Sequence, residues 1–506
     1  MILKKLKYLH ITNFIHKYSI VILPILIYLI SSSWHNDNLK RFTWDDAYIL
    51  MSSAKTLYLY GKPSVSIFHE NLYGITSPLY MIILFLIHNT NLEIFEESIR
   101  LINIIFGIGC ITMIYLILLK FGTNEMYNKF IALGGSLFFS FHAQTSFITN
   151  SGMETNLYIF IFILNLFIYI YKINIIYLAI FNIVMLFIRP DSLLIIPIFI
   201  LSMFVIRKVS IKDLILYFIV ITFGIILYAL MFYKMTGHPI PNTASAKYNY
   251  FLYSCMNLKE RSFIFFEGYF HYLKSMSGLF FLAIIGLKFN KNSREVLFVF
   301  LIYIILHSIS SLLFIPDGSI AYQGRYFILV YLGLIFFASS GLINIGIILS
   351  KLKFNNSIII GSLVILILFV MYSMIHEKKR LKNFHREASL HHERLYKQAL
   401  FIKSITNKND IISSTDLGIL AYISERKIID LVGLGNPEVR NLYTDEFGKC
   451  IPNEKRDLTN IIERFGLQYL LVAKPWDKNF MGNYIQKLNG KIKLIDSSGY
   501  DLYKVE

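Results

Sequence analysis

Charged residues are scarce in this chain. Asp, Glu, Lys and Arg make up 16% of its 506 residues, whereas 55% of the residues are hydrophobic and the mean hydropathy is +0.55. Such a composition excludes an ordinary water-soluble domain, in which about 25% of residues are charged. Acids are fewer than bases, 32 against 49, and the formal net charge is +17.

Several familiar sequence signatures are also absent. Three cysteines are too few for a disulfide framework. Cys255 and Cys450 either form a disulfide with each other or stay reduced, and the disulfide is the less favoured alternative. We find no P-loop, dinucleotide fingerprint or Cys/His cluster, which argues against nucleotide binding and against a zinc site. No small-residue cleavage site follows the first apolar run, so we predict that the N-terminus is not a removable signal peptide.

Long apolar runs are abundant. Runs of roughly 17–25 residues are typical of membrane-spanning helices. We predict such helices at 17–33, 98–119, 129–148, 153–171, 173–188, 191–206, 212–233, 277–289, 295–315, 326–349 and 356–376. The run 77–88 is shorter and indicates a re-entrant or surface-lying segment.

Basic residues divide the loops into two sets. Lys4, Lys5 and Lys7 precede the first span, and every second loop after it is basic. Because basic loops stay on the cytoplasmic side, we predict a multi-pass protein of the bacterial inner (plasma) membrane with a cytoplasmic N-terminus. The basic loops contain Lys120 and Lys129; Lys172; Arg207, Lys208 and Lys212; Lys288, Lys291 and Arg294; and Lys351 and Lys353. Contact with anionic membrane lipids accounts for the net charge, and nucleic-acid binding is not needed.

The residues after 376 are markedly more polar. The run KNDIISSTDLGILAYISERKIIDLVG predicts a strand, a helix and a strand, and YLLVAK and IKLIDSSGYDLYKV predict further strands. We therefore expect a mainly α protein with two domains. Residues 1–376 would form the membrane bundle, with a surface helix in the outer loop 34–97, and residues 377–506 a small extracytoplasmic α/β domain.

Two adjacent acids follow the first span, in the segment FTWDDAYIL. A helix from Thr43 or Trp44 to Gly61 would hold Asp45 and Asp46 in its first turn, where the helix dipole favours negative charge. Its apolar residues recur as in an amphipathic helix lying on a membrane. The acids are then either capping residues on a solvated face or a site for proton abstraction or metal binding. Adjacent helical residues point about 100° apart, so we expect the two acids to serve different partners.

Three more polar motifs fall on the predicted outer side. In YGITSPLY, Thr76 and Ser77 precede a proline, as at the start of a helix. In SGMET, Glu154 enters a span, where it either caps the helix or meets a charged partner. In IRPDS, Arg189 and Asp191 stand between two apolar runs and either pair with each other or bind a ligand.

Two later loops add polar and basic groups to the same side. PIPNTASAKY contains Asn242 and Lys247, and AYQGRYF contains Arg325 directly before a span. An arginine at headgroup depth suits a phosphate group, whether of an anchoring lipid or of a substrate. Acids and bases thus gather on one face of a membrane protein, which suits chemistry on a lipid-linked, anionic substrate.

The order of these motifs resembles a known family. DDAYI, GITSPL, GMET, RPD, PNTASAK and GR, followed by DLGILAYISERKIIDLVGL, resemble the multi-spanning GT-C glycosyltransferases, and among them the mycobacterial terminal arabinofuranosyltransferases. The resemblance implies a membrane enzyme that transfers a hexose or pentose from a polyprenyl-phosphate donor to a cell-envelope glycan or glycolipid, with inversion. The residues before Gly-Arg in AYQGRYF are less polar than we would expect in that branch. We therefore do not predict that the transferred sugar is arabinose.

The resemblance also implies residue roles. An acid of the first outer loop is the catalytic base in this superfamily, and we predict Asp45 as the base and Asp46 as its companion. The leaving phosphate needs positive charge, for which we predict Arg325, Lys247 and Arg189. Substrate contacts are predicted for Tyr48, Thr76, Ser77, Glu154, Asp191 and Asn242. Some relatives in the superfamily use a divalent metal ion, but the sequence shows no ligand set for one, and we name no cofactor.

Two alternatives come from other classes of protein. A transporter or flippase of a lipid-linked glycan would also have many spans and intramembrane charges. The sequence shows no paired halves, and a polar outer domain with a surface helix suits an acceptor-handling enzyme better. A non-catalytic membrane scaffold is the remaining alternative.

Overall fold

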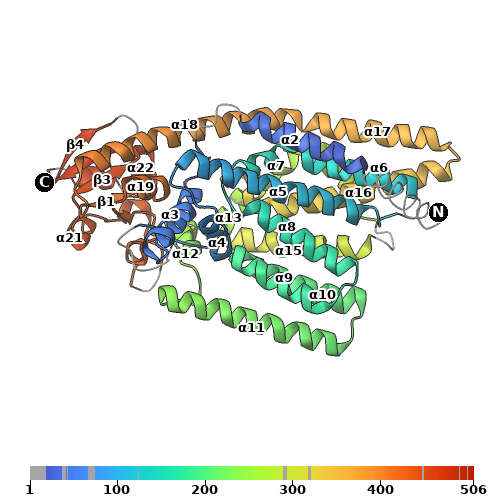
Figure 1. The fold of residues 1–506 in the computed structure, drawn as a ribbon, viewed down its shortest axis with the longest axis horizontal. Coiled ribbons are helices and arrows are strands. Elements are labelled where there is room, and N and C mark those ends of the chain that lie inside the picture. The colour runs from blue at the N-terminus through green and yellow to red at the C-terminus, as the bar shows by residue number, and fades with distance from the viewer. Residues whose placement is uncertain are drawn as a thin grey trace, which may run out of the picture.

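The protein is a long helical bundle with a small β-sheet at one end (Figure 1). The computed structural model describes residues 19–36, 41–42, 44–66, 74–122, 125–288, 293–316, 321–446, 449–481, 483–488, 490–497 and 500–506. Within these ranges, six stretches of helix are long and apolar enough to cross a membrane, and three shorter helices are also apolar. This architecture confirms the predicted fold class, a polytopic helical membrane protein with a small C-terminal sheet.

Each predicted span overlaps a helix of the bundle, but not every one of these helices is long enough to cross a membrane. Helix α14 (Ser277–Ile285), within the span expected at 277–289, has nine residues. The span expected at 129–148 is divided at His142 into two helices, and the others correspond to single principal helices. The bundle consists of α2 (Ile22–Asn36), α5 (Leu92–Leu118), α6 (Glu125–Phe141), α7 (Ala143–Thr149), α8 (Thr155–Ile170), α9 (Ile175–Ile188), α10 (Ile195–Ser202), α11 (Ile211–Thr236), α14 (Ser277–Ile285), α15 (Arg294–Phe314), α16 (Ile328–Lys351) and α17 (Asn356–Ser373).

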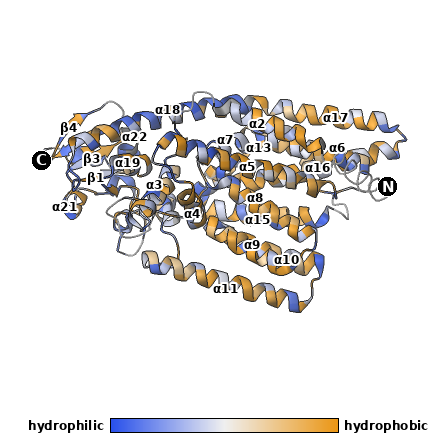
Figure 2. Ribbon diagram, in the orientation of Figure 1, coloured by the Kyte–Doolittle hydropathy of each residue, from blue (hydrophilic) through white to orange (hydrophobic). Residues whose placement is uncertain are grey.

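The bundle is apolar outside as well as inside. Figure 2 shows hydrophobic residues along most of its length. Helix α11 lies along one edge and exposes large side chains such as Phe218, Phe223 and Leu230. Extensive exposed apolar area is costly in water but expected of a helix that faces lipid. In contrast, α16 is buried from Ile328 to Asn344 and forms the centre of the bundle.

The basic loops lie together at the end of the bundle away from the sheet. Lys120 Nζ lies 3.3 Å from the ring centre of Tyr171, in the next basic loop. Arg207 forms a 3.1 Å ion pair with Glu295. Asn344 Nδ2 donates to the Lys288 carbonyl over 3.2 Å. These contacts connect chain segments at or near the basic loops. The loops that the sequence assigns to one side of the membrane therefore lie at one end of the bundle in the structure.

Helix α3 (Asp45–Tyr60) lies between the bundle and the sheet (Figure 1). It follows Trp44 and ends at Gly61, whose φ of 69° is readily adopted by glycine, and both limits agree with the sequence prediction. The structure differs in the helix's surroundings: every residue from Ala47 to Ala54 is buried, so α3 has no broad exposed face. Helix α4 (Pro78–Leu86), of nine residues, packs against α3 and is too short to cross a membrane.

A single long helix, α18 (Ile375–Ile405), connects the bundle to the sheet. Its sequence contains neither glycine nor proline and continues almost directly from α17, although the residues change from hydrophobic to hydrophilic (Figure 2). Lys378 Nζ donates to Ser31 Oγ of α2 over 2.7 Å, and the ring of Phe384 packs against Phe147 of α7. The C-terminal region, defined here as residues 375–506, is therefore fastened to the bundle along the side of α18.

The sheet has five strands in the order β2-β1-β3-β5-β4. The strand, helix and strand predicted for one run are β1 (Ile411–Ser414), α19 (Gly418–Ser424) and β2 (Lys427–Asp430). Strand β1 pairs in parallel with β2 and β3 (Tyr469–Val472), whereas β5 (Asp501–Val505) is antiparallel to both β3 and β4 (Ile492–Asp496). Short helices complete this part: α20 (Pro437–Arg440), α21 (Ile461–Phe465), α22 (Lys474–Phe480) and α23 (Tyr484–Lys487).

The C-terminal region is also attached to the chain segment between α11 and α14. That segment forms α12 (Thr243–Tyr250) and α13 (Leu258–Ser275). Cys255 and Cys450 form a disulfide with a Cα–Cα distance of 5.1 Å, so the less favoured sequence alternative is the correct one. The two cysteines are 195 residues apart, and only the tertiary fold brings them together. Arg456, which is fully buried, donates to the carbonyl oxygens of Asn249 and Tyr250 at the end of α12.

Candidate active site

Two cavities meet where α3, α12 and the C-terminal region come together. The bundle cavity, about 380 Å³, lies among the ends of bundle helices, and the sheet-side cavity, about 440 Å³, lies between α3, α18 and the loops of the sheet. Both cavities are lined by Asp46, Ile49, Lys247 and Leu434, so these residues form the boundary between them. A molecule in each cavity would meet the other beside Asp46.

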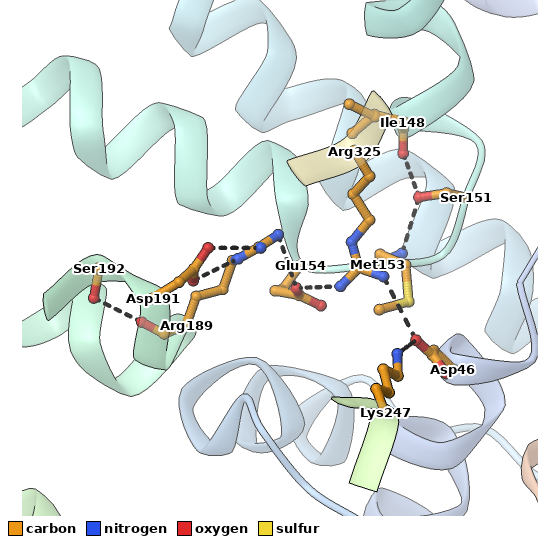
Figure 3. A network of polar contacts seen from close by, with 10 residues as sticks. All are labelled: Asp46, Ile148, Ser151, Met153, Glu154, Arg189, Asp191, Ser192, Lys247 and Arg325. Carbon is orange, nitrogen blue, oxygen red and sulfur yellow. Dashed lines mark hydrogen bonds and ion pairs between the residues drawn. The ribbon is translucent and has the colours of Figure 1, made fainter. Parts of the chain in front are cut away.

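A connected set of charged side chains lines the bundle cavity (Figure 3). Lys247 Nζ from α12 lies 3.1 Å from Asp46 Oδ2, and Arg325 Nη1 lies 3.7 Å from the same oxygen. Arg325 Nη2 lies 2.8 Å from Glu154 Oε1 at the start of α8. Arg325 belongs to the short helix η5 (Ala321–Phe327), directly before α16. Three separate stretches of chain thus converge around Asp46.

The set continues from Glu154 to the motif between α9 and α10. Arg189 Nη1 lies 3.8 Å from Glu154 Oε1. The same guanidinium binds Asp191 with two parallel contacts, Nε to Oδ1 over 3.0 Å and Nη2 to Oδ2 over 2.8 Å. Arg189 is extended, with φ −149° and ψ 128°, because the following proline disfavours helical backbone at this position. The Arg–Asp pair that the sequence offered as an alternative does form, and it does so within the cavity lining.

Several polar atoms of this set are buried without a hydrogen-bond partner among the described residues. They are Glu154 Oε2, Arg189 Nη1, and Arg325 Nε and Nη1. Arg325 is 5% exposed and Glu154 is 1% exposed. Buried polar atoms are nearly always hydrogen-bonded, and guanidinium groups suit oxyanions that accept two hydrogen bonds. Guanidinium N–H groups that lack a hydrogen-bond partner and lie at a cavity therefore suit an anionic ligand such as a phosphate.

The same cavity has an apolar part. Leu193 and Leu194 from η2 (Pro190–Leu194) line it together with Ile240 and, from the end of α15 and just beyond, Phe314 and Ile315. Three cationic side chains and a hydrocarbon wall in one cavity suit a ligand that has both a charged group and a lipid tail.

Asp45 faces the other cavity and has different partners. Its carboxylate accepts hydrogen bonds from the backbone N–H groups of Gly418, over 2.5 Å, and Ile419, over 2.8 Å, at the start of α19. Gly418 has no room for a Cβ, because its backbone lies directly against the carbonyl of Asp45. Burial and the nearby charge of Asp416 raise the pKa of Asp45 to about 8, although the two N–H groups counter this rise.

Asp46 differs from Asp45 in its electrostatics. Burial acts to raise the pKa of Asp46, but the positive charges of Lys247 and Arg325 outweigh it and hold the pKa below its usual value. Asp46 therefore stays ionised and is a weak base, whereas Asp45 binds a proton more readily. The sequence expectation that the two acids have different partners agrees with this geometry.

The predicted site residues do not all reach the cavities. The structure places Asp46, Thr76, Glu154, Arg189, Asp191, Lys247 and Arg325 in the bundle cavity and Asp45 in the sheet-side cavity. Tyr48 is buried and donates to Glu96 Oε1 over 2.7 Å. Ser77 precedes α4 as expected and is buried. Asn242 Nδ2 donates to the Gly433 carbonyl over 2.7 Å, so it holds the loop whose Leu434 lines both cavities.

Sequence reasoning missed part of the sheet-side cavity. Asp416, Tyr500 and His391 line it, and none of them was assigned a role. Asp416 lies within the DLGIL motif that carried the family resemblance, so a signal for it existed. His391 and Tyr500 have no such signal, because they come from α18 and from the residue before β5.

The acids of the site do not form a ready set of metal ligands. Asp46, Glu154 and Asp191 are each ion-paired with lysine or arginine. The described parts of the chain contain no group of three or more His, Cys, Asp or Glu residues arranged to hold a metal ion. We therefore derive no step that passes through a metal.

Comparison with known families gives a partial match. Residues 382–503 match the model of a domain of unknown function, DUF8728. This match covers nearly all of the C-terminal region and none of the bundle. No curated protein sequence matches the chain.

Solved structures match over the whole chain. ArnT from Cupriavidus metallidurans, bound to undecaprenyl phosphate, is similar with a TM-score of 0.54 and 11% identity over 96% of this chain and 97% of its own. ArnT in the apo state gives a TM-score of 0.54 and 11% identity, with 98% of each chain covered. The Archaeoglobus fulgidus oligosaccharyltransferase, tethered to an acceptor peptide, gives 0.52 and 13% identity over 97% of this chain and 74% of its own.

These similarities define the class of fold. The chain is a multi-pass membrane protein with the GT-C fold, as the sequence resemblance implied. At 11–13% identity the similarity concerns the fold alone. The particular branch, that of the arabinofuranosyltransferases, is not among these structures and stays a prediction.

Proposed function

We propose that this protein is a membrane glycosyltransferase that moves a sugar from a polyprenyl-phosphate donor to a glycan or glycolipid acceptor of the cell envelope. One observation carries the proposal: three cationic side chains and two carboxylates with unlike basicity meet where two cavities join. Cations stabilise a departing phosphate, and a basic carboxylate accepts the proton of an attacking hydroxyl. The arabinofuranosyltransferase branch stays within this proposal as one choice of sugar.

The donor would occupy the bundle cavity. Arg325, Lys247 and Arg189 would contact its phosphate, and the apolar wall with Leu193 and Phe314 would contact the first part of its lipid tail. The guanidinium N–H groups of Arg325 and Arg189 that have no hydrogen-bond partner support this placement. That a structure of the same fold is bound to undecaprenyl phosphate also favours a polyprenyl phosphate here.

The acceptor would approach through the sheet-side cavity, opposite the donor. Asp45 would remove the proton from its hydroxyl while the hydroxyl oxygen bonds to the anomeric carbon and the bond from that carbon to phosphate oxygen breaks. Polyprenyl phosphate leaves with the bonding electrons, and Asp45 keeps the proton. Attack from the side away from the leaving group is a single displacement and inverts the anomeric centre. Asp46, which stays ionised, would face the positive charge that develops on the sugar.

This proposal is tested with purified protein, synthetic polyprenyl-phosphate sugars and membrane-derived acceptors. Release of free polyprenyl phosphate together with a longer glycan is the expected result, and Arg325→Gln should reduce it about 10²–10³-fold. Proteoliposomes provide the decisive comparison with transport. If the labelled lipid-linked sugar crosses the bilayer unchanged and no donor is consumed, the protein is a flippase and the proposal is wrong.

We also propose that residues 1–376 form the membrane domain, that residues 377–506 form a separate domain, and that this domain and the active site face the outside. Two independent features support this orientation. The loops at the opposite end are basic, and the Cys255–Cys450 disulfide belongs in an oxidising compartment.

Orientation is tested with single cysteines introduced at two exposed lysines at opposite ends of the molecule. In intact cells, a membrane-impermeant maleimide should label Lys491→Cys in the C-terminal region. It should label Lys351→Cys, at the end of α16, only after the cells are permeabilised. The reverse pattern would place the sheet in the cytoplasm and overturn the proposed acceptor side.

A further inference from the structure

A third carboxylate lies beside the proposed base. Asp416 is in the loop between β1 and α19, two residues before Gly418, whose N–H binds Asp45. Asp45 and Asp416 line the same cavity, and the negative charge of Asp416 helps to raise the pKa of Asp45. The tight contact of Gly418 with the Asp45 backbone fixes the loop in this position. The backbone of the loop that carries Asp416 is therefore packed against the start of α3, which carries Asp45.

Asp416 has its own partners, which hold its carboxylate in place. The Tyr500 hydroxyl donates a hydrogen bond to Asp416 Oδ2, and His391 Nε2 lies 3.0 Å from the same hydroxyl. Gln398 of α18 fixes the backbone of Tyr500 with two hydrogen bonds, of 2.8 and 3.2 Å. Burial raises the pKa of Asp416, and Tyr500 and His391 counter that rise. These two residues favour the ionised form of Asp416.

The other charged groups around the pair do not neutralise it. The titratable residues that line the cavity are Asp45 and Asp46 from α3, Lys247 from α12, Glu387, His391 and His392 from α18, Asp416 and Tyr500. Lys247 binds Asp46 over 3.1 Å. In the described part of the structure no lysine or arginine forms an ion pair with Asp45 or Asp416. Two neighbouring carboxylates without a lysine or arginine partner share a proton more readily than either carboxylate binds one alone.

We propose that Asp416 is a positioning residue for the base: its carboxylate, held by Tyr500 and His391, keeps Asp45 basic enough to take the proton from the acceptor hydroxyl. The inference rests on the proposed function. The proton moves from the acceptor oxygen to Asp45, and the repulsion between the two carboxylates falls as it arrives. The C-terminal region thus contributes to the chemistry of a site whose proposed base and phosphate-binding cations come from residues before 375.

The test measures protonation of Asp45 without any sugar donor. Dicyclohexylcarbodiimide reacts with protonated carboxyl groups in apolar surroundings, and peptide mass spectrometry gives the labelled fraction of Asp45 at each pH. Labelling in the full-length protein should fall with a midpoint near pH 8, the pKa of Asp45. In Asp416→Asn the midpoint should move down by about one pH unit or more, because a like charge is lost. Asp416→Glu, which keeps the charge, should stay near the wild-type value.

Two further variants make the test specific. Tyr500→Phe removes the hydrogen bond that favours ionised Asp416, so label should move from Asp45 to Asp416. Asp457→Asn removes an exposed acid of the same region that does not line the cavity, and should change nothing. If Asp416→Asn has wild-type thermal stability and an unchanged Asp45 midpoint, the inference is wrong.

The inference and the proposed function fail in different ways. An absence of sugar transfer by the wild-type protein would defeat the function even if the labelling midpoints shift. Active wild-type protein with an unchanged midpoint in Asp416→Asn would defeat the inference alone. With an active donor, the acid limb of the kcat/KM profile should shift in Asp416→Asn by the same amount as the labelling midpoint. A purely structural role would lower the rate without moving that limb.

Discussion

Replacement of Asp45 by asparagine should reduce the turnover of the proposed sugar transfer by about 10²–10⁴-fold while the polyprenyl phosphate of the proposed donor still binds. An amide cannot accept the proton, whereas the cations of the bundle cavity do not depend on Asp45. Because the base must be unprotonated, the wild-type rate should rise with pH until about 8, the pKa of Asp45, and then level off. Turnover is measured from the release of polyprenyl phosphate, and lipid binding from the rise in unfolding temperature that it causes.

Asp46→Asn is the matched comparison. This change releases Lys247 and Arg325 from a carboxylate, so it should alter the KM for the donor, and it also removes the charge that would face the reacting sugar, so turnover should fall. Because the charge of Asp46 contributes to the raised pKa of Asp45, the rise of the rate with pH should move to lower pH but should still be present. Should Asp46→Asn lose all turnover while Asp45→Asn stays within tenfold of wild type, the proton acceptor is Asp46 and the assignment of the two acids must be exchanged.

Arg325→Met combined with Glu154→Leu should give a stable but inactive protein. Loss of Arg325 alone removes the shorter of the two ion pairs of buried Glu154 and leaves only the 3.8 Å pair with Arg189, which should cost up to about 3–5 kcal/mol of stability. Replacement of both partners by apolar residues of similar size removes that penalty, but the proposed phosphate ligand is still gone. We expect the double variant to unfold near the wild-type temperature and to transfer sugar about 10²–10³-fold more slowly.

A second ion pair provides the control. Arg207→Met with Glu295→Leu makes the same exchange at a 3.1 Å pair in the basic end of the bundle, and should leave transfer near wild type. Recovery of transfer in the variant that lacks Arg325 and Glu154 would mean that this pair only supports the fold.

The sequence predicted the positions of the bundle helices and the local backbone at the motifs, because both depend on local patterns. Apolar length is enough to find the spans, and Gly61 or the proline after Arg189 sets a local backbone conformation. The partners of Glu154 and Asp46 were beyond reach, since Arg325 is 171 residues from Glu154 in sequence. The disulfide and the long helix α18 were missed for related reasons: the first needs tertiary proximity, and the second has a polar sequence that the apolar pattern does not reveal.

The relation of α3 to the sheet shows the same limit. Its sequence indicated a helix with one side on the membrane and one side in water, but α19 covers the second side. That contact depends on Gly418, where a side chain would collide with the backbone of Asp45. Asp45, Asp416, Tyr500 and His391 come together from four separate stretches of chain, and no spacing rule connects them.

The two attachments of the C-terminal region restrict the path by which a substrate enters. Helix α18 attaches that region to the bundle on one side. On another side, the Cys255–Cys450 disulfide and the hydrogen bonds of Arg456 attach it to the segment that carries Lys247. A region joined at two places cannot swing open like a lid without breaking a covalent bond or a continuous helix. Under the proposed function, an acceptor glycan therefore slides in sideways, past the exposed side chains of Glu387 and His391, and its growing end leaves by the same opening.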